Sequence, residues 1–414
     1  MSPFVRRFVS QGHLVDSGLL TGMLNLIIEE GADYRIIDFQ LGKTNQDISQ
    51  LDLELHCDSD EALREVSAKL IDLGCYERAT PEADFEPAPT DACAPEEFYS
   101  TTHHHTQVFV EGSWREVREQ RMDGVIVLQG GKLVCKKLRE LKRGEPVLCG
   151  SESIRLLPKF RDREIGSFGF MTNDVSSERS VEVAVDKTAE GLEAHKQAGE
   201  RCVVVAGPVV IHTGGGSALA ALIRNGYVQG FLSGNALAVH DVESVLFGTS
   251  LGIDLESGKP VDQGHRNHMR AINWIQGFGS LSGAVDSGQL RRGIMFELIR
   301  ENIPFALAGS IRDDGPLPDT VTDIIEAQRH YEQILRGASL VLMLGTMLHS
   351  IAVGNMLSSA VRTICVDIQP SVITKLVDRG SAHTIGIVTD VGLFLRSLAG
   401  KLIGSTGNGT STAD

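Results

Sequence analysis

The sequence has no excess of basic residues, since 39 Lys and Arg stand against 54 Asp and Glu and give a net charge of −15 over 414 residues. General binding to nucleic acid or to anionic membranes needs a basic surface, so the composition argues against both classes of partner. No apolar segment reaches membrane-spanning length without a charge, a glycine turn or a proline. The first 15 residues also lack the continuous apolar core of a secretory signal.

Paired cysteines are absent as well. The seven cysteines are scattered and never form a CxxC pair, which disfavours a disulfide framework and a zinc ribbon and fits a reducing compartment. The HRNH segment would place His265 and His268 on one helix face, but no nearby cysteine or carboxylate pattern completes a metal site. We therefore expect a cytoplasmic protein without a bound metal.

The two common nucleotide-binding motifs, GxGxxG and the P-loop, are missing too. The stretch from Cys202 to Asp241 nevertheless has the order of a strand, a glycine turn and a helix, with Gly214, Gly215 and Gly216 at the turn. Glycines at such a junction allow backbone N–H groups to approach an anion at the start of the helix. A phosphate site and a tight turn that binds nothing are equally compatible with this stretch.

The N-terminal part of the chain has the pattern of a small α+β module. Helical spacing over residues 18–30, strands at 34–41 and 51–56, and a second helix at 61–73 predict the order α-β-β-α. A stretch rich in proline and acid predicts an exposed linker or loop, and short alternating runs after it predict a β-rich unit. The predicted parts are 1–78 (α+β module), 79–100 (linker or loop), 101–165 (β-rich unit), 166–400 (main domain) and 401–414 (disordered tail).

The main domain has near-continuous aliphatic strands that alternate with helical segments, which is typical of strands buried on both faces. The pattern predicts an α/β fold with a Rossmann-like, doubly wound parallel sheet. Ligands bind such sheets at the carboxyl ends of the strands. The strand-end residues that we predict to bind a dinucleotide are Gly207, Pro208, His212, Thr213, Gly214, Gly234, Asn235, Ala236, Gly345, Thr346, Asp367, Thr389 and Asp390.

Two of these strand ends have a specific chemistry. Asp367 closes a strand about twenty residues after the Gly345–Thr346 turn, where a carboxylate can bind the ribose hydroxyls of a dinucleotide. It can equally cap the helix that begins near Ser371. Asn235 can bridge a ribose or a carboxamide, although the Gly-Asn pair is also common at tight turns.

The loop from Ala308 to Asp319 is the best candidate for binding the substrate and reacting with it. It holds Arg312 together with Asp313, Asp314 and Asp319, a set that can bind both ends of a zwitterionic amino acid. A solvated acidic turn, with Asp319 capping a helix, is the alternative.

Long motifs in a fixed order give the chain a family resemblance over residues 4 to 398. It resembles the family with a LOR/SDH-type domain, which includes the archaeal-type ornithine cyclodeaminases and the C-terminal part of the cyanobacterial arginine dihydrolase fusions. The motifs that carry the resemblance include FQLGKTNQDIS, FGFMTNDVSSER, AGPVVIHTGGG, SGNALAVHDVE, GHRNHMRAIN, AGSIRDDGPLPD, LMLGTMLHSIAVGN and VDIQPSVITKLVDRGSA. The resemblance implies a main domain of the deoxyhypusine synthase and sirtuin type, and it favours a homo-oligomer. No guanidine-removing domain precedes the module, so we do not expect arginine dihydrolase activity.

The resemblance further implies that L-ornithine is converted to L-proline and ammonia with tightly bound NAD. A hydride leaves the α-carbon, the δ-amine attacks the resulting imine, ammonia departs, and the hydride returns. The reaction needs a dry site and a general base. We expect Asp313 or Asp314 to be the base or to anchor the δ-ammonium, and Arg312 to bind the substrate carboxylate. His240 and Asp241 are the second candidate pair.

The sequence leaves two other functional classes open. One is an NAD-dependent dehydrogenase of another amino acid or of an opine such as saccharopine. The other is a non-catalytic NAD-binding protein whose N-terminal module senses an amino acid. The first predicts consumption of an amine, and the second predicts binding without product.

Overall fold

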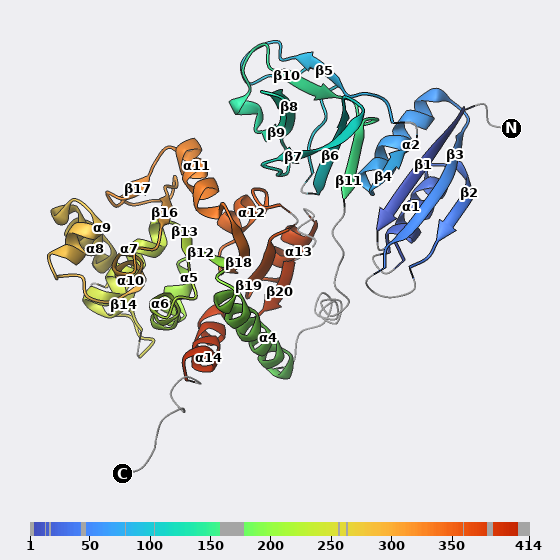
Figure 1. Cartoon of the computed structure of the whole chain (residues 1–414). Helices are drawn as coiled ribbons and strands as arrows, with labels where there is room; N and C mark the ends of the chain where they lie inside the picture. The colour runs from blue at the N-terminus through green and yellow to red at the C-terminus, as the bar shows by residue number, and fades with distance from the viewer. Residues whose placement is uncertain are drawn as a thin grey trace. The chain divides into compact units, whose positions relative to one another are not determined.

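The structure is a computed structural model that describes residues 4–12, 14–15, 18–42, 47–78, 80–102, 104–157, 178–255, 257–261, 264–358, 360–378 and 384–404. The chain forms two compact units (Figure 1). The first comprises Met1–Ser167 with Leu357–Ala360, and the second comprises Phe168–Met356 with Val361–Asp414. The predicted boundary at residues 165/166 and residues 405–414 of the predicted tail lie outside the described residues. Residues 401–404, predicted as the start of that disordered tail, instead form the end of helix α14 (Val391–Gly404).

The first unit begins with a four-stranded antiparallel sheet in the order β2-β3-β1-β4. With its two helices it has the βαββαβ order of a ferredoxin-like module. Its elements are β1 (Phe4–Gly12), α1 (Leu19–Glu29), β2 (Asp33–Gln40), β3 (Ser49–Cys57), α2 (Asp60–Asp72) and β4 (Cys75–Glu77). The four predicted elements are confirmed, whereas β1 and β4 were missed.

Strand β1 was missed because its apolar and polar residues do not alternate clearly. Phe8 is fully buried, but Arg6 and Arg7 interrupt the apolar pattern. Both arginines are paired across the sheet: the Arg6 guanidinium lies 2.7 Å from the Glu77 carboxylate, and Arg7 Nε donates to Asp52 Oδ1 at 2.6 Å. A paired arginine fits a strand that looks too polar in the sequence alone.

The β-rich part of the first unit is a seven-stranded sheet in the order β11-β6-β7-β9-β8-β10-β5. Its elements are β5 (Asp84–Pro87), β6 (His105–Val110), β7 (Ser113–Arg118), β8 (Val125–Gln129), β9 (Lys132–Lys136), the short helix η1 (Leu138–Glu140), β10 (Pro146–Cys149) and β11 (Ile154–Leu157). Strand β5 lies within the segment predicted as a linker or loop, and it pairs with β10. That prediction was therefore wrong for residues 84–87, because the ladder to β10 orders a proline-rich segment.

The second unit contains a seven-stranded parallel sheet in the order β17-β16-β13-β12-β18-β19-β20. Its strands are β12 (Arg201–Ala206), β13 (Gly230–Gly234), β16 (Phe305–Ala308), β17 (Thr320–Val321), β18 (Ala338–Leu344), β19 (Arg362–Asp367) and β20 (Thr384–Val388). The order reverses between β12 and β18, which makes this pair the topological switch point. The predicted doubly wound parallel sheet is confirmed.

Helices alternate with these strands. They are α4 (Glu178–Gln197), α5 (Val209–His212), α6 (Gly216–Arg224), α7 (Asn235–Phe247), α8 (His265–Phe278), α9 (Leu281–Asp286), α10 (Ile294–Arg300), α11 (Ile324–Leu335), α12 (Met347–Gly354), α13 (Pro370–Asp378) and α14 (Val391–Gly404). A two-stranded ribbon, β14 (Thr249–Ser250) and β15 (Ile253–Asp254), follows α7. Among the described residues, no helix is both long and apolar enough to cross a membrane.

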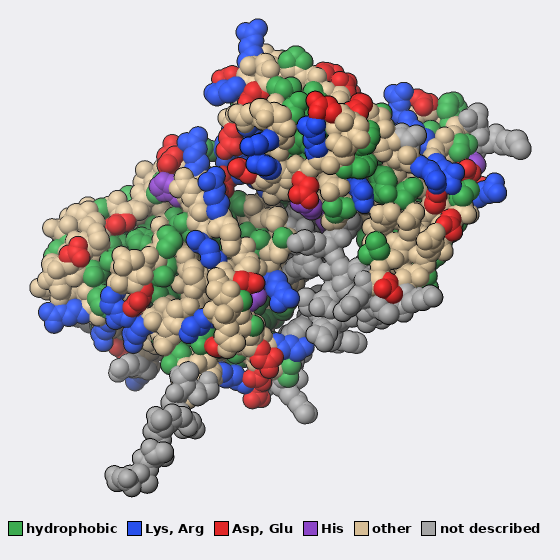
Figure 2. All heavy atoms as spheres, viewed as in Figure 1, with side chains coloured by type: hydrophobic (Ala, Val, Ile, Leu, Met, Phe, Trp, Pro, Cys, Tyr) green, Lys and Arg blue, Asp and Glu red, His purple; other side chains and the backbone are tan. Residues whose placement is uncertain are grey.

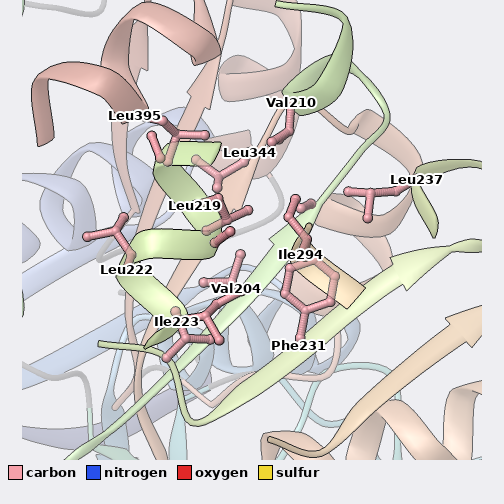
Figure 3. Close-up of a cluster of buried hydrophobic side chains, with 14 of the residues drawn as sticks. Val204, Val210, Leu219, Leu222, Ile223, Phe231, Leu237, Ile294, Leu344 and Leu395 are labelled. Atoms are coloured by element: carbon pink, nitrogen blue, oxygen red, sulfur yellow. The ribbon is translucent and has the colours of Figure 1, made fainter. Parts of the chain in front are cut away.

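The core of the second unit lies between the sheet and its helices (Figure 3). Val204, Phe231 and Leu344 come from strands, while Leu219 and Leu395 come from helices, and all five are fully buried. Burying each such side chain contributes about 1.5–3 kcal/mol. This packing holds the ends of β12, β13 and β18 in fixed positions, where the candidate site residues lie.

Charged side chains of both signs are interspersed over the visible face (Figure 2).

Candidate active site

The switch point brings two glycines against each other. Gly207 follows β12, and its N–H donates to Leu344 O of β18 at 2.9 Å. A Cβ on Gly207 would lie 2.3 Å from the carbonyl oxygen of Gly345, and Gly345 itself has a φ of +56°. A side chain on Gly207 would displace the backbone of Gly345, and the positive φ of Gly345 favours glycine there. The two strand ends therefore pack closely, backbone against backbone, at the switch point.

Helix α12 begins directly after Gly345. Its N-cap residue, Thr346, makes no side-chain cap hydrogen bond; its Oγ1 lies 3.0 Å from His349 Nδ1 instead. The side chain of Thr346 therefore does not cap α12, and the positive end of a helix favours an anion. These contacts fit the predicted phosphate role of Gly345 and Thr346.

Asp367 closes the neighbouring strand β19. Its side chain is buried, and Oδ1 accepts from Gln369 N at 2.8 Å. Burial raises the pKa of this carboxyl, although the N–H groups of Gln369 and Ile368 oppose the rise. The carboxylate stands two strands from β12, beside the α12 N-terminus, where a dinucleotide ribose binds in folds of this class.

Asp390 has a different contact from the one predicted. Its Oδ1 accepts from Leu393 N at 2.7 Å, so the side chain caps α14. The glycine turn after α5 is bound by helix α14, because Arg396 of α14 donates to Thr213 O at 2.8 Å. Within the stretch from Cys202 to Asp241, the apolar residues Val209–His212 before the glycine turn form the one-turn helix α5 rather than a strand.

Three imidazoles from three different helices pack against one another with their rings tilted or edge to face. His212 ends α5, His240 lies on α7 and His268 on α8; the ring centroids of His212 and His240 are 4.7 Å apart, as are those of His240 and His268. His212 Nδ1 lies 2.6 Å from Ser250 Oγ. Burial and the neighbouring His240 lower the pKa of His212 to about 4, although Glu243 opposes this. His212 therefore stays neutral at physiological pH.

Glu243 lies beside these imidazoles, and the sequence analysis did not identify it as a site residue. It is fully buried, one turn after His240, and its Oε2 lies 3.0 Å from His240 Nδ1 and 3.8 Å from His268 Nδ1. His240, Glu243 and His268 each offer one atom that could bind a metal ion, and these three atoms all lie within 4.8 Å of one another. The H-x-x-E spacing on one helix was the signal available in the sequence. We call His212, His240, Glu243 and His268 the histidine cluster.

Asp241 is not part of this cluster, and the structure corrects our pairing of it with His240. Its two carboxylate oxygens accept from Ile294 N at 3.0 Å and from Met295 N at 2.8 Å, at the start of α10. Burial raises the pKa of Asp241 to about 6, although these two N–H groups oppose the rise. Its contacts are those of a helix cap, so we leave it out of the proposed catalytic set.

Asn235 also has a contact that the sequence did not suggest. Its Oδ1 accepts from Leu317 N and from Thr320 Oγ1, each at 3.0 Å. Its amide thus fastens the loop of residues 308–319 to the start of α7. A Cβ on the preceding Gly234 would lie 3.0 Å from His349 Cε1, so this turn is packed against α12.

The loop itself reaches the histidine cluster. Asp314 Oδ2 lies 3.7 Å from His268 Nε2, and 71% of the Asp314 side chain is exposed. Asp313 Oδ2 accepts from Ser310 N at 2.8 Å, and Arg312 is exposed. Asp319 accepts from Leu281 N at 2.8 Å, at the start of α9, which agrees with the capping alternative for this residue. The loop therefore carries one cation and two carboxylates, and one of these carboxylates, Asp314, lies beside His268.

A glycine-lined switch point of a parallel sheet, a helix N-terminus without a side-chain cap and a buried acid at the end of the next strand define a dinucleotide-binding protein of the Rossmann class. Three family models match the chain: the LOR/SDH bifunctional enzyme conserved region over residues 6–104, and the first region and the Rossmann fold of the arginine dihydrolase ArgZ-like C-terminal part over residues 105–185 and 186–398. The chain belongs to this family.

Similar proteins cover nearly all of the chain. An ornithine cyclodeaminase of Methanocaldococcus jannaschii is 46% identical over 96% of both chains. The bifunctional arginine dihydrolase/ornithine cyclodeaminase AgrE of Nostoc is 48% identical over 95% of this chain, which spans 57% of that protein's length. A crystal structure of the ternary complex of AgrE with ornithine and NAD+ matches with 45% identity and a TM-score of 0.54, over 97% of this chain and 58% of that one. The match confirms the family resemblance read from the sequence motifs.

Proposed function

We propose that the chain is an NAD-dependent ornithine cyclodeaminase, which converts L-ornithine to L-proline and ammonia. The observation that carries the proposal is the juxtaposition, at one sheet edge, of a dinucleotide cradle with a buried carboxylate–imidazole cluster. Full-length similarity to proteins named ornithine cyclodeaminase supports it.

The strand-end residues would hold NAD. Gly345, Thr346 and the start of α12 suit the phosphates, and Asp367 suits a ribose diol. Gly207, Pro208, Gly234 and Ala236 would line the cradle, with His212, Thr213, Gly214 and Thr389 beside it. When bound, NAD supplies a hydride acceptor that later returns the hydride to the same carbon.

The loop of residues 308–319 would bind the substrate. Arg312 suits the substrate carboxylate because its guanidinium can form paired hydrogen bonds with it. Asp313 or Asp314 would anchor the δ-ammonium. Both ends of ornithine would then be fixed, with the α-carbon facing the cradle.

His240 would act as the general base. Both nitrogens of ornithine are ammonium groups near neutral pH, and neither can react until it loses a proton. His240 is buried, its Nδ1 faces Glu243, and its other ring nitrogen, Nε2, can accept a proton. Exclusion of water by the buried cluster would protect the imine from hydrolysis.

The proposal extends to the cellular location and the oligomeric state of the protein. All seven cysteines are free, and six of them are buried, which supports a cytoplasmic location. We propose a homo-oligomer on the basis of the family resemblance.

The test is to incubate the pure protein with L-ornithine and to detect proline and ammonia by mass spectrometry and an enzymatic assay. We expect one proline for each ammonia, without an added oxidant, and NAD in the supernatant of the denatured protein. An Arg312→Gln variant should raise KM for ornithine at least about tenfold, because it removes a charged hydrogen bond. Absence of proline at every NAD concentration would contradict the proposal.

A further inference from the structure

Glu243 is fixed more firmly than its position on a helix requires. Its Oε1 accepts from Thr249 Oγ1 at 2.9 Å and from Gly252 N at 3.3 Å. Thr249 Oγ1 is in turn held by Asn267 Nδ2 at 3.0 Å. These bonds stop the carboxylate from rotating and direct Oε2 at His240.

The partners of Glu243 are unusual for a buried carboxylate. Glu297, which is equally buried in the same unit, is paired with two permanent cations, Arg224 and Arg300, with N–O distances of 2.6 and 2.7 Å. Glu243 has imidazoles instead, and among the described residues it forms no ion pair with Lys or Arg. A buried carboxylate without a permanent cation is costly, and such an arrangement marks functional sites more often than structural ones.

The hydrogen bond between Glu243 and His240 settles the tautomer of the imidazole. Burial alone would raise the pKa of Glu243, but its interactions with His240, His268 and Thr249 outweigh burial and lower the pKa to about 2. An ionised carboxylate can only accept a hydrogen bond. His240 Nδ1 must therefore carry the proton, and in neutral His240 the lone pair is on Nε2.

We propose that Glu243 is a positioning residue, which holds His240 with its proton on Nδ1 so that Nε2 accepts protons from the substrate amines. The inference rests on the proposed ornithine chemistry, and it assigns a role to a residue that the sequence motifs did not single out. The arrangement follows the logic of a carboxylate that orients a histidine base.

The proton balance of the ring closure needs such a base. The δ nitrogen enters as –NH3+ and ends as the ring iminium –NH+=, while the α nitrogen starts as =NH2+ and leaves as NH4+. The bond between the δ nitrogen and the α-carbon forms, and the bond between the α nitrogen and that carbon breaks. Two protons thus pass from one nitrogen to the other. His240 Nε2 takes and returns each in turn, and Glu243 stabilises the imidazolium between transfers.

Ionisable side chains face His240 from three helices. The rings of His212 on α5 and His268 on α8 lie with their centroids 4.7 Å from that of His240, and Glu243 Oε2 of its own helix lies 3.0 Å from its Nδ1. Asp314 lies beyond His268, 3.7 Å from its Nε2. Glu243 therefore supplies the carboxylate that contacts His240.

The experiment compares Glu243→Gln, Glu243→Asp and the control Glu297→Gln in the NAD-loaded full chain. We expect Glu243→Gln to lower kcat at least about 100-fold, with NAD content kept and KM for ornithine changed less than about threefold. Glu243→Asp should recover part of the loss. The acidic limb of the pH profile should move to lower pH in Glu243→Gln, because the variant removes a negative charge 3.0 Å from the imidazole of the base. Glu297→Gln should lower Tm and leave the limb unchanged.

A second pair of variants guards against misfolding. Thr249→Val removes the bond to Oε1 and should lower kcat several-fold, whereas Thr249→Ser should match the wild type. Imidazole ¹⁵N NMR gives a readout independent of turnover: it should show the proton of His240 on Nδ1 in the wild type.

Three results would overturn the inference. The first is a kcat of Glu243→Gln within threefold of the wild type, and the second is a loss that follows Tm while the pH profile stays fixed. The third is one divalent metal per chain that disappears in Glu243→Gln, because a metal on Oε2 would displace the Nδ1 proton. A wild type that makes no proline but shows the expected tautomer would sink the proposed function and not the assignment of the tautomer.

Discussion

At the residue scale, three buried carboxylates of the second unit have three different partners. Asp241 accepts from the backbone of α10, Glu297 binds two arginines, and Glu243 binds imidazoles. Backbone N–H groups and arginines cannot exchange protons in the working range of an enzyme, whereas imidazoles can. The roles of these three carboxylates are distinguished by their partners and not by their residue type.

Asp241 and His240 are neighbours in sequence and should respond differently to substitution. Asp241→Asn places an amide donor against a backbone donor, so we expect unfolding to become easier by about 1–3 kcal/mol. Turnover per NAD-loaded chain should stay within about threefold of the wild type, whereas His240→Gln should lose at least about 100-fold. Thermal unfolding and proline formation measure the two effects. A silent His240→Gln or an inactive, stable Asp241→Asn would reverse the assignment.

His212 should make stability depend on pH. Its pKa in the fold, about 4, lies below the ordinary histidine value because burial disfavours the charged ring. The folded state then binds fewer protons than the unfolded state between these values, so its contribution is complete above pH ~6.5 and is lost as the pH falls toward ~4. His212→Gln should flatten the fall in Tm between pH 7 and 5. The exposed His330 is the control, and an equal flattening in His330→Gln would refute the argument.

At the element scale, the site depends on where strands end. The apolar runs of β12, β13, β16, β18, β19 and β20 could be recognised in the sequence, because buried parallel strands are aliphatic throughout. Their carboxyl ends then followed directly. What could not be recognised was which strand-end side chains would be engaged by the protein itself, because those contacts join residues far apart in sequence: Asn235 holds Leu317, and Asp319 holds Leu281.

Two acids at successive strand ends give a matched pair for the cofactor assignment. Asp390 caps α14, so Asp390→Ala should destabilise the fold by about 1 kcal/mol and keep NAD affinity. Asp367→Ala should weaken NAD binding at least about tenfold, because a ribose hydroxyl would lose a charged acceptor. Isothermal titration with NAD compares both variants. Equal affinities for Asp367→Ala and the wild type would remove Asp367 from the site.

At the scale of the whole molecule, the sequence predicted more of the second unit than of the first. The doubly wound sheet was predicted from its strands, whereas β1 and β4 of the four-stranded sheet and β5 of the seven-stranded sheet were missed in the first unit. Strand β1 carries Arg6 and Arg7, and strand β5 lies in a proline-rich segment. In both cases long-range pairing overrides local composition.

The histidine cluster shows the same limit. His212, His240 and His268 lie on three helices, and each is unremarkable in its own segment. We expected no metal because no carboxylate completes a site near His265 and His268; in the fold, Glu243 of another helix lies beside His268. The absence of a bound metal stays a prediction.

In the proposed reaction the hydride removed from the α-carbon of ornithine returns to the same carbon while His240 moves the protons. Turnover of L-[2-²H]ornithine in ordinary water, with the position of the label in proline read by NMR, tests this return. We expect deuterium to stay at the α-carbon of proline, without any added oxidant. Proline with hydrogen from water at that carbon would rule out the return of the hydride.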